Sequence, residues 1–266
     1  MTNSDHHFAI GKSHTVCEDY AASQPQFTAL SDGCSCVIDE NGKKVDAHTD
    51  IGSRLLVRAA FHHQSILDES EFYTAATHTA DGYRRQLGMG LGTLSATLMT
   101  LRTVGTINHY FHVTACGDGV IALRHRDGSG WFVQCIEFDG PPDYPRYRLS
   151  DRSRVVSYPV RWFGHKSLAD DSKILHLSQR YSWFSEICCT KDYDLAVCMS
   201  DGAFSFTKDS NPVEFNVEFA NRLLDFRRMA GRFVLRHLTG VLRELAEDGI
   251  VNQDDISMIA MYNAEE

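Results

Sequence analysis

The chain has 266 residues, of which 43% are hydrophobic, and a formal net charge of −9 at pH 7. This length and composition permit one large domain or two small ones, with ample core. The acidic balance argues against non-specific nucleic-acid binding, which needs a basic face. No apolar run is long enough to span a membrane, and the polar start over 1–7 is unlike a signal peptide. We therefore expect a monomeric cytoplasmic protein without nucleic-acid or membrane partners, whose eight cysteines are reduced thiols.

The first half of the chain predicts strands and two helices. In chain order, the predicted elements are strands over 8–10 and 27–31, helices over 51–61 and 71–87, and strands over 95–103, 110–116, 120–124 and 131–138. Thr49 or Asp50 is the expected cap of the first helix, and a Ser/Gln/Pro loop is expected over 21–26. The short turns between the last four strands favour an antiparallel meander.

The second half begins with a segment of different composition. Residues 139–171 carry four of the six prolines and no long apolar period, which indicates an irregular excursion. A strand is predicted over 194–199, a long amphipathic helical segment broken near Gly231 over 217–247, and a last strand over 256–261. Helices grouped between blocks of strands favour an α+β fold, with antiparallel sheets and helices packed outside, in a single domain over 1–266.

Aspartates that end apolar runs are the main chemical signal. Asp-Gly occurs seven times, and most such pairs are ordinary turns. Only Asp32, Asp118 and Asp201 close a long apolar run, and Ser-Asp-Gly is repeated at 31–33 and 200–202. A carboxylate held at the edge of a core is costly unless a cation meets it. Two strand-end aspartates far apart in sequence therefore suggest one shared cation site.

Further acids lie beside predicted strand ends. They are Glu18, Asp19, Asp254 and Asp255. Hard divalent cations such as Mg²⁺ and Mn²⁺ prefer oxygen ligands, and a cluster of carboxylates can hold two of them when one carboxylate bridges both. The cations in turn remove the repulsion between like charges brought together.

Six motifs, in order along 8–262, resemble those of the type 2C metal-dependent serine/threonine protein phosphatases, the PPM family, in a divergent bacterial-type branch. The motifs are Gly11…Cys17-Glu18-Asp19, Ser31-Asp32-Gly33, Gly92…Thr97, Cys116-Gly117-Asp118, Met199-Ser200-Asp201-Gly202 and Asp254-Asp255-Ile256-Ser257. The resemblance implies two stacked antiparallel sheets flanked by helices, an α-β-β-α sandwich. It also implies that 139–171 lies near the variable flap of the family.

The resemblance implies a hydrolase acting on phosphoserine and phosphothreonine in a phosphorylated protein substrate, with two Mn²⁺ or Mg²⁺ ions and a third, weaker position. The implied metal ligands are Asp32, Gly33, Asp201, Asp254, Glu18 and Asp118, with Asp32 and Asp201 as catalytic residues. By this resemblance, Asp32 would bridge the two ions and Asp118 would serve the third. A water that bridges two divalent ions loses a proton readily and becomes the nucleophile that attacks phosphorus.

Three features depart from the family pattern, one of which is Gly117-Asp118-Gly119 in place of the usual Gly-Asp-Ser-Arg. His14 stands where the family usually has an arginine, and is the candidate group for the substrate phosphate. Cys34 stands where many members have a histidine, so no general acid is assigned. Two alternatives stay open: a catalytically weak binding or regulatory module with this fold, and a small-molecule phosphomonoesterase.

Arginines outside these motifs are weaker candidates. Arg227-Arg228 indicates a solvated face. The arginines of the excursion could meet a phosphorylated partner; they are Arg146, Arg148, Arg152 and Arg154.

Overall fold

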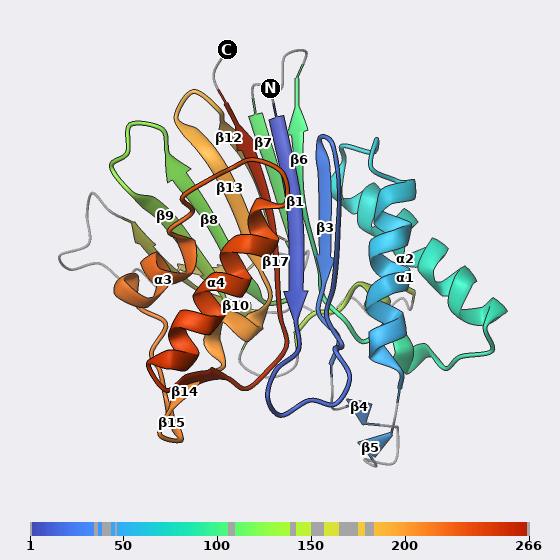
Figure 1. Ribbon diagram of the computed structural model, residues 1–266. Coiled ribbons are helices and arrows are strands. Elements are labelled where there is room, and N and C mark those ends of the chain that lie inside the picture. Colours follow the sequence, from blue (N-terminus) through green and yellow to red (C-terminus); the bar gives the residue numbers. More distant parts are fainter. Residues whose placement is uncertain are drawn as a thin grey trace.

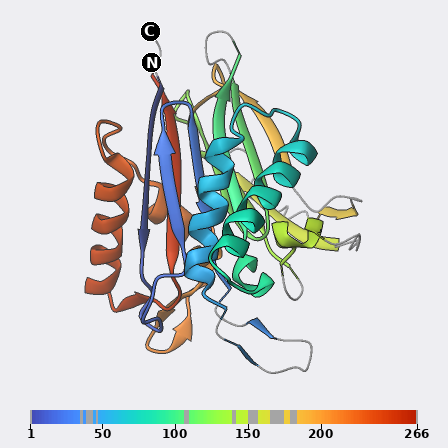
Figure 2. The same ribbon diagram turned by 90° about the vertical axis from the view of Figure 1, so that its right-hand side faces the viewer.

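Two antiparallel β-sheets form the centre of the molecule, and helices cover both outer faces (Figures 1 and 2). The computed structural model describes residues 2–34, 37–38, 44–45, 47–105, 110–138, 142–149, 157–164, 175–178 and 184–264. The seven-stranded sheet has the order β1 (Thr2–Ala9), β17 (Ile256–Asn263), β13 (Tyr193–Met199), β8 (Gly119–His125), β9 (Trp131–Ile136), β10 (Ser157–Gly164) and β11 (Leu175–Ser178). The five-stranded sheet has the order β12 (Phe184–Cys189), β7 (Tyr110–Cys116), β6 (Leu98–Val104), β3 (Phe27–Ser31) and β2 (Tyr20–Gln24).

The helices form the two outer layers. α1 (Thr49–His62) and α2 (Glu69–Gln86) cover the five-stranded sheet, whereas α3 (Val217–Leu224) and α4 (Phe233–Glu247) cover the seven-stranded sheet. The remaining elements are the pair β4 (Val37–Ile38) and β5 (Lys44–Val45), the small sheet β14 (Phe206–Lys208), β15 (Asn211–Pro212) and β16 (Ile250–Asn252), and the 3₁₀ helices η1 (Leu91–Leu94), η2 (Pro145–Leu149) and η3 (Asp201–Phe204). The predicted α+β sandwich is confirmed, and so is the break of the 217–247 segment near Gly231.

Strand β13 shows why the layers form. Leu195, Val197 and Met199 pack in the core under α3 and α4, while Ala196 and Cys198 pack in the core between the two sheets. A strand buried on both faces reads as a continuous apolar run, which is the pattern that predicted this strand. Because apolar side chains hold both faces, the residue that follows the strand is fixed in space.

The predicted meander is wrong in one respect, because its four strands divide between the two sheets. β6 pairs with β7 in the five-stranded sheet, and β8 pairs with β9 in the seven-stranded sheet. The connection at Gly117-Asp118 carries the chain from one sheet to the other. Short turns between strands fit a meander and a sheet-to-sheet crossing equally well, so the pattern did not distinguish them.

Two predictions near the N-terminus are also wrong. Residues 20–24 form β2 rather than a loop, because pairing with β3 overrides the weak strand preference of alanine and serine. Helix α1 follows His48, which has φ 52°, without a side-chain cap. The Thr49 hydroxyl instead donates to Glu18 Oε1 at 2.8 Å.

The proline-rich segment 139–171 is described only in part. Its described residues form η2 and β10, and β10 extends the seven-stranded sheet beyond β9. Residues 139–141, 150–156 and 165–171 lie outside the described residues. The single domain with a flap therefore stays a prediction. Among the described residues, no helix is both long enough and apolar enough to cross a membrane.

Candidate metal centre

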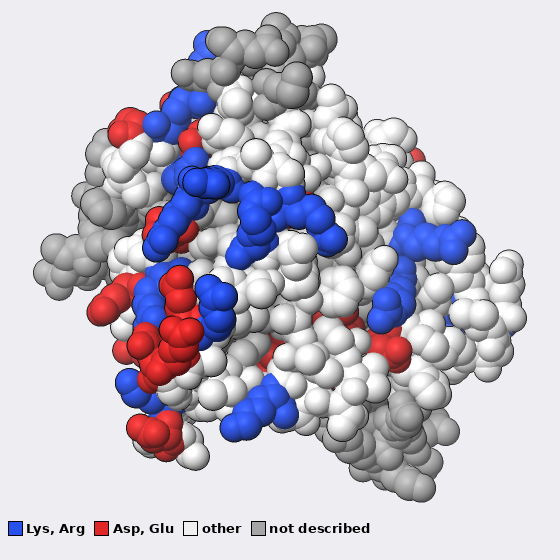
Figure 3. Space-filling view, viewed as in Figure 1, with Lys and Arg blue, Asp and Glu red and all other residues white. Residues whose placement is uncertain are grey.

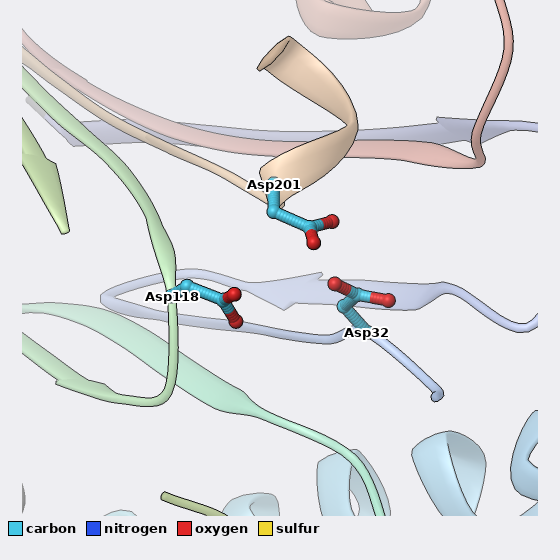
Figure 4. Close-up of side chains that lie close together, drawn as sticks. All are labelled: Asp32, Asp118 and Asp201. Carbon is cyan, nitrogen blue, oxygen red and sulfur yellow. The ribbon is translucent and has the colours of Figure 1, made fainter. Parts of the chain in front are cut away.

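Three aspartates from separate strand ends meet where the two sheets face each other (Figure 4). Asp32 follows β3 of one sheet, Asp118 lies in the β7–β8 connection, and Asp201 begins η3, one residue beyond the end of β13 of the other sheet. One carboxylate oxygen of each lies within 4.8 Å of those of the other two. The structure therefore brings together Asp32 and Asp201, as the repeated Ser-Asp-Gly motif predicted, and Asp118 joins them within the same 4.8 Å limit.

Partial burial and mutual repulsion make this aspartate cluster unfavourable when all three groups are ionised. Burial, followed by the charges of Asp201 and Asp19, raises the pKa of Asp32 well above its ordinary value. Burial and the charge of Asp201 raise the pKa of Asp118 to about 8, and burial raises the pKa of Asp201. The Oδ1 atom of Asp118 is buried and has no hydrogen-bond partner within the described chain. This set of oxygen donors fits a hard divalent cation, which would supply the missing positive charge.

Asp19 lies beside the cluster, fully buried and hydrogen-bonded. Ser200 Oγ donates to Asp19 Oδ2 at 2.8 Å, and the Ser257 backbone N–H donates to Ser200 Oγ at 2.9 Å. These bonds join the first motif to the ends of β13 and β17. Burial raises the pKa of Asp19 to about 7. Since Ser200 directly precedes Asp201, these bonds also fix the backbone position of Asp201, which carries the carboxylate.

Gly33 and Glu18 lie against each other on the α1 side of the cluster. A Cβ atom on Gly33 would come within 2.8 Å of the Glu18 carbonyl oxygen and 3.0 Å of Ser53 Oγ. A side chain at this position would therefore push the first motif away from α1. The bond from Thr49 Oγ1 holds the Glu18 carboxylate, whose pKa is raised by burial. Glu18 lies outside the tight group of three aspartates.

Asp254 also lies outside that group, at its solvent side. Its side chain is 44% exposed, and Asp254 Oδ1 lies 3.3 Å from His14 Nε2. The other ring nitrogen, Nδ1, lies 3.0 Å from Asp255 Oδ2. Burial opposes the charged form of His14, but Asp255, Asp254 and Glu18 outweigh it and raise the pKa of the imidazole. The charge of Asp254 contributes to the raised pKa values of Asp118 and Asp201, so it lies within electrostatic reach of the cluster.

Asp255 joins the N-terminal motif to the last strand. Its Oδ1 accepts from the Gly11 backbone N–H at 2.8 Å, and its Oδ2 accepts from the Glu18 backbone N–H at 2.6 Å. With His14, the carboxylate has partners on both oxygens. We infer that Asp255 fixes the loop that presents His14 and Glu18.

Solved structures share this fold over nearly the whole chain. The serine/threonine phosphatase of S. agalactiae is 12% identical, covers 99% of this chain and 100% of its own, and superposes with a TM-score of 0.57. The PPM phosphatase MsPP of Mycobacterium smegmatis, in complex with cacodylate, is 12% identical over 98% of both chains, with a TM-score of 0.51. The catalytic domain of PstP with two manganese ions is 13% identical over 99% of both chains, with a TM-score of 0.52. This chain has the PPM phosphatase fold. No protein-family model and no curated protein matches its sequence.

The PPM fold brings Tyr144, which the sequence did not single out, to the aspartate cluster. Its side chain is buried, and burial together with a hydrogen bond to Cys34 raises the pKa of the phenol. The charges of Asp118 and Asp32 raise this pKa further, so the hydroxyl lies within electrostatic reach of both. Tyr144 comes from the proline-rich segment, where no periodic pattern marked it. Its position next to Pro145 is the only sequence feature that could have drawn attention to Tyr144.

Arg146 and Arg148 of the same segment pack against other side chains rather than extending into solvent. Arg148 Nη1 donates to Cys116 Sγ at 3.1 Å. The guanidinium of Arg146 lies over the rings of Tyr144 and Tyr147, 5.7 and 5.1 Å from their centroids. Arg152 and Arg154 lie outside the described residues. A phosphorylated partner at these arginines stays a prediction.

Proposed function

We propose that this chain is a metal-dependent phosphatase that hydrolyses phosphoserine and phosphothreonine in proteins. The observation that carries this proposal is the cluster of Asp32, Asp118 and Asp201 at the strand ends of a PPM fold. Three carboxylates with raised pKa values need a counter-charge, and a divalent cation supplies it. Similar solved structures are serine/threonine phosphatases, one of them with two manganese ions.

Two Mn²⁺ or Mg²⁺ ions, with a third weaker position, would be held by acids of both sheets. The proposed ligands are Asp32, Gly33 through its carbonyl, Asp201, Asp254, Asp118 and Glu18, the last through water. Divalent ions bound there acidify water and offset the negative charge of a phosphoryl group. Asp118 is a stronger candidate than its motif suggested, because one of its carboxylate oxygens lies within 4.8 Å of oxygens of both Asp32 and Asp201.

The chain's own residues hold and orient these ligands. Rigid strands position Asp32 and Asp201, and the bonds from Ser257 through Ser200 to Asp19 fix the residue before Asp201. His14 is the proposed group for the substrate phosphate. Its imidazolium form is favoured by Asp255 and Asp254, so it presents positive charge at the solvent side of the cluster.

A binding or regulatory module is the second candidate function. Both ring nitrogens of His14 already face carboxylates, at 3.3 and 3.0 Å. A histidine engaged in this way has less freedom to grip phosphate than an arginine with a bidentate fork. The aspartate cluster would still bind metal in such a module.

Turnover of a phosphoserine peptide with Mn²⁺, and then with excess chelator, tests the proposal. We expect activity with Mn²⁺, loss of activity in chelator and recovery when Mn²⁺ is returned. The variant Asp32→Asn should be inactive under all three conditions. Activity that persists in chelator would refute a metal-dependent mechanism. An aryl phosphate assayed in parallel distinguishes the small-molecule phosphomonoesterase, which would turn over the aryl phosphate but not the peptide. Metal binding without turnover of either substrate would favour the binding module.

A further inference from the structure

A second charged site lies between α3 and α4, on the outer side of the seven-stranded sheet. It is a groove of about 360 Å³. Its charged lining residues are Arg222, Arg227, Arg228, Arg236, Asp225 and Glu244. The aspartate cluster is built from strand ends, whereas this groove is built from two helices and their connection. None of the proposed metal ligands lines it.

The groove is basic although the chain is acidic. Residues 222–236 contain five arginines and one aspartate, in a chain with a net charge of −9. Figure 3 shows Lys and Arg side chains gathered in an arc over the α3–α4 connection, with acidic side chains below it. This local positive field would attract an anionic group.

Some of these arginines are already paired, and others are available. Arg222 Nη2 lies 2.6 Å from Asp248 Oδ2, and Arg227 Nε lies 3.6 Å from Asp225 Oδ2. Arg228 and Arg236 form no ion pair with any described residue; Arg236 donates to the Ala230 carbonyl at 2.6 Å. The side chain of Arg227 is 80% exposed, so its pairing with Asp225 is weak. Arg228 and Arg236 therefore carry the available positive charge.

The wall of the groove is rigid. The ring of Phe226 stacks on His237, with centroids 3.9 Å apart, and meets Phe233 edge-on at 5.8 Å. His237 Nε2 lies 2.7 Å from the Leu223 carbonyl oxygen and donates to it, which ties α4 to the end of α3. Because these rings fix the α3–α4 connection, little ordering of this wall would be needed when a ligand binds.

Gly240 leaves the groove open in the middle of α4. A glycine inside a helix is less favourable than an alanine. A Cβ atom added at Gly240 would meet no atom within 4 Å, so nothing in the fold requires a glycine there. The missing side chain leaves room beside Val241 and Phe233, the apolar part of the lining.

We propose that the α3–α4 groove binds an acidic segment of a partner protein, with carboxylates on Arg228 and Arg236 and one apolar side chain over Gly240. Guanidinium groups bind carboxylates through paired hydrogen bonds, and arginine clusters are a common means of recognising acidic motifs. A long polyanion such as a nucleic acid fits less well, because it would extend beyond the groove over a chain that as a whole is acidic. This second site goes beyond the proposed phosphatase activity and does not depend on it.

Binding of a labelled peptide, in which one leucine is flanked on both sides by glutamates, tests the proposal by fluorescence anisotropy. We expect binding that weakens as salt is added. Arg228→Glu should weaken it about tenfold or more, because one charged contact is worth at least about 1.4 kcal/mol. The matched control is Arg243→Glu, which makes the same charge change on α4 outside the groove lining and should retain binding.

Filling the groove gives an independent test. Gly240→Leu should abolish peptide binding while the thermal midpoint stays the same or rises, because leucine is a better helix former than glycine. Gly82→Leu is the matched control, since Gly82 is a glycine of α2 whose Cβ would also meet nothing within 4 Å. It should leave binding unchanged.

Four results would overturn the proposal. They are no binding of the glutamate peptide, equal binding of a peptide with lysines in place of glutamates, equal losses in Arg228→Glu and Arg243→Glu, and tighter binding of a single-stranded oligonucleotide at the same arginines. Turnover of an aryl phosphate should be the same in Arg228→Glu as in the wild type. This assay separates a wrong groove proposal from a wrong proposal of phosphatase activity.

Discussion

The aspartate cluster and the α3–α4 groove concentrate charge in opposite ways. The three aspartates follow or connect strands packed on both faces, and their oxygens meet within 4.8 Å. The arginines of the groove extend from a short helix, a connection and one face of α4 into solvent. The first arrangement holds like charges together by the rigidity of the sheets. The second lets flexible side chains keep their charges apart.

This difference determines what each region can do. Carboxylates that cannot move apart repel one another unless a proton or a cation binds, so their chemistry depends on an ion of high charge density. Exposed arginines lose little by remaining unpaired, because water screens them, so they suit weak and salt-sensitive contacts. Substitutions in the cluster should therefore change catalysis strongly, whereas substitutions in the groove should change peptide binding or stability and leave turnover unchanged.

Asp201→Asn should give the largest effect. The amide keeps the shape and one oxygen ligand but removes a negative charge, so metal should bind more weakly. We expect turnover to fall by about 10²-fold or more, on the order of 3 kcal/mol of barrier. Metal-free stability should stay the same or rise, because one charge of a repulsive cluster is removed. Turnover and thermal melting, each with and without Mn²⁺, measure both effects.

The matched control for this variant is Asp225→Asn, which makes the same change at an exposed aspartate of the groove. It should leave turnover unchanged. If Asp201→Asn retains wild-type turnover, Asp201 is not a catalytic ligand.

The metal-free protein should lose stability as the pH rises. The pKa of Asp118 is raised to about 8, so folding favours its protonated form. The stability contributed by that proton is present at acidic pH and is lost as the pH rises through about 8. We therefore expect the melting temperature of Asp118→Asn in chelator to rise relative to that of the wild type as the pH increases from about 5 to about 9. A difference that does not change with pH would show that Asp118 is ionised throughout this range.

His14→Ala should have an intermediate effect. Loss of a hydrogen bond to a charged group costs about 1.5–3 kcal/mol, which predicts a fall in kcat/KM of about 10-fold to 100-fold for a phosphopeptide. The fall should lie mainly in KM if His14 contacts the substrate phosphate. His14→Arg, which restores a bidentate donor, should recover most of the loss. If His14→Arg is as impaired as His14→Ala, the histidine serves to position Asp254 rather than to bind phosphate.

Gly240→Ala should have the smallest effect. It should raise the free energy of unfolding by roughly 0.5–1 kcal/mol, because alanine favours the helix and its Cβ meets no neighbour within 4 Å. Turnover should not change. Urea denaturation measures the gain, with Gly82→Ala on α2 as a comparison. A destabilised Gly240→Ala would show that α4 needs the glycine for packing.

The aspartate cluster could be predicted in part from the sequence, because the end of a buried strand is recognisable from the residues next to it. The apolar runs before Asp32 and Asp201 predicted both strands, and the repeated Ser-Asp-Gly predicted their meeting. The position of Asp118 was harder to predict. Its motif is also local, but its closeness to the other two depends on the crossing between sheets, which short turns do not reveal. No periodic pattern marked Tyr144.

The groove could not be predicted from the sequence. Arg227-Arg228 indicated only a solvated face, because nothing in the sequence shows that α3 and α4 leave a groove between them. Gly240 carried no signal either, since a glycine within a helical pattern has several explanations. Local patterns predict elements and their ends, whereas a surface between two elements depends on how they pack.

Anomalous scattering from crystals soaked in Mn²⁺ tests the central claim most directly. The account predicts peaks at the aspartate cluster, within about 2–2.6 Å of carboxylate oxygens of Asp32 and Asp201. Soaked crystals of Asp201→Asn should show weaker peaks at the same place. A map without any peak among Asp32, Asp118 and Asp201 at saturating Mn²⁺ would contradict the claim that this cluster is a metal centre.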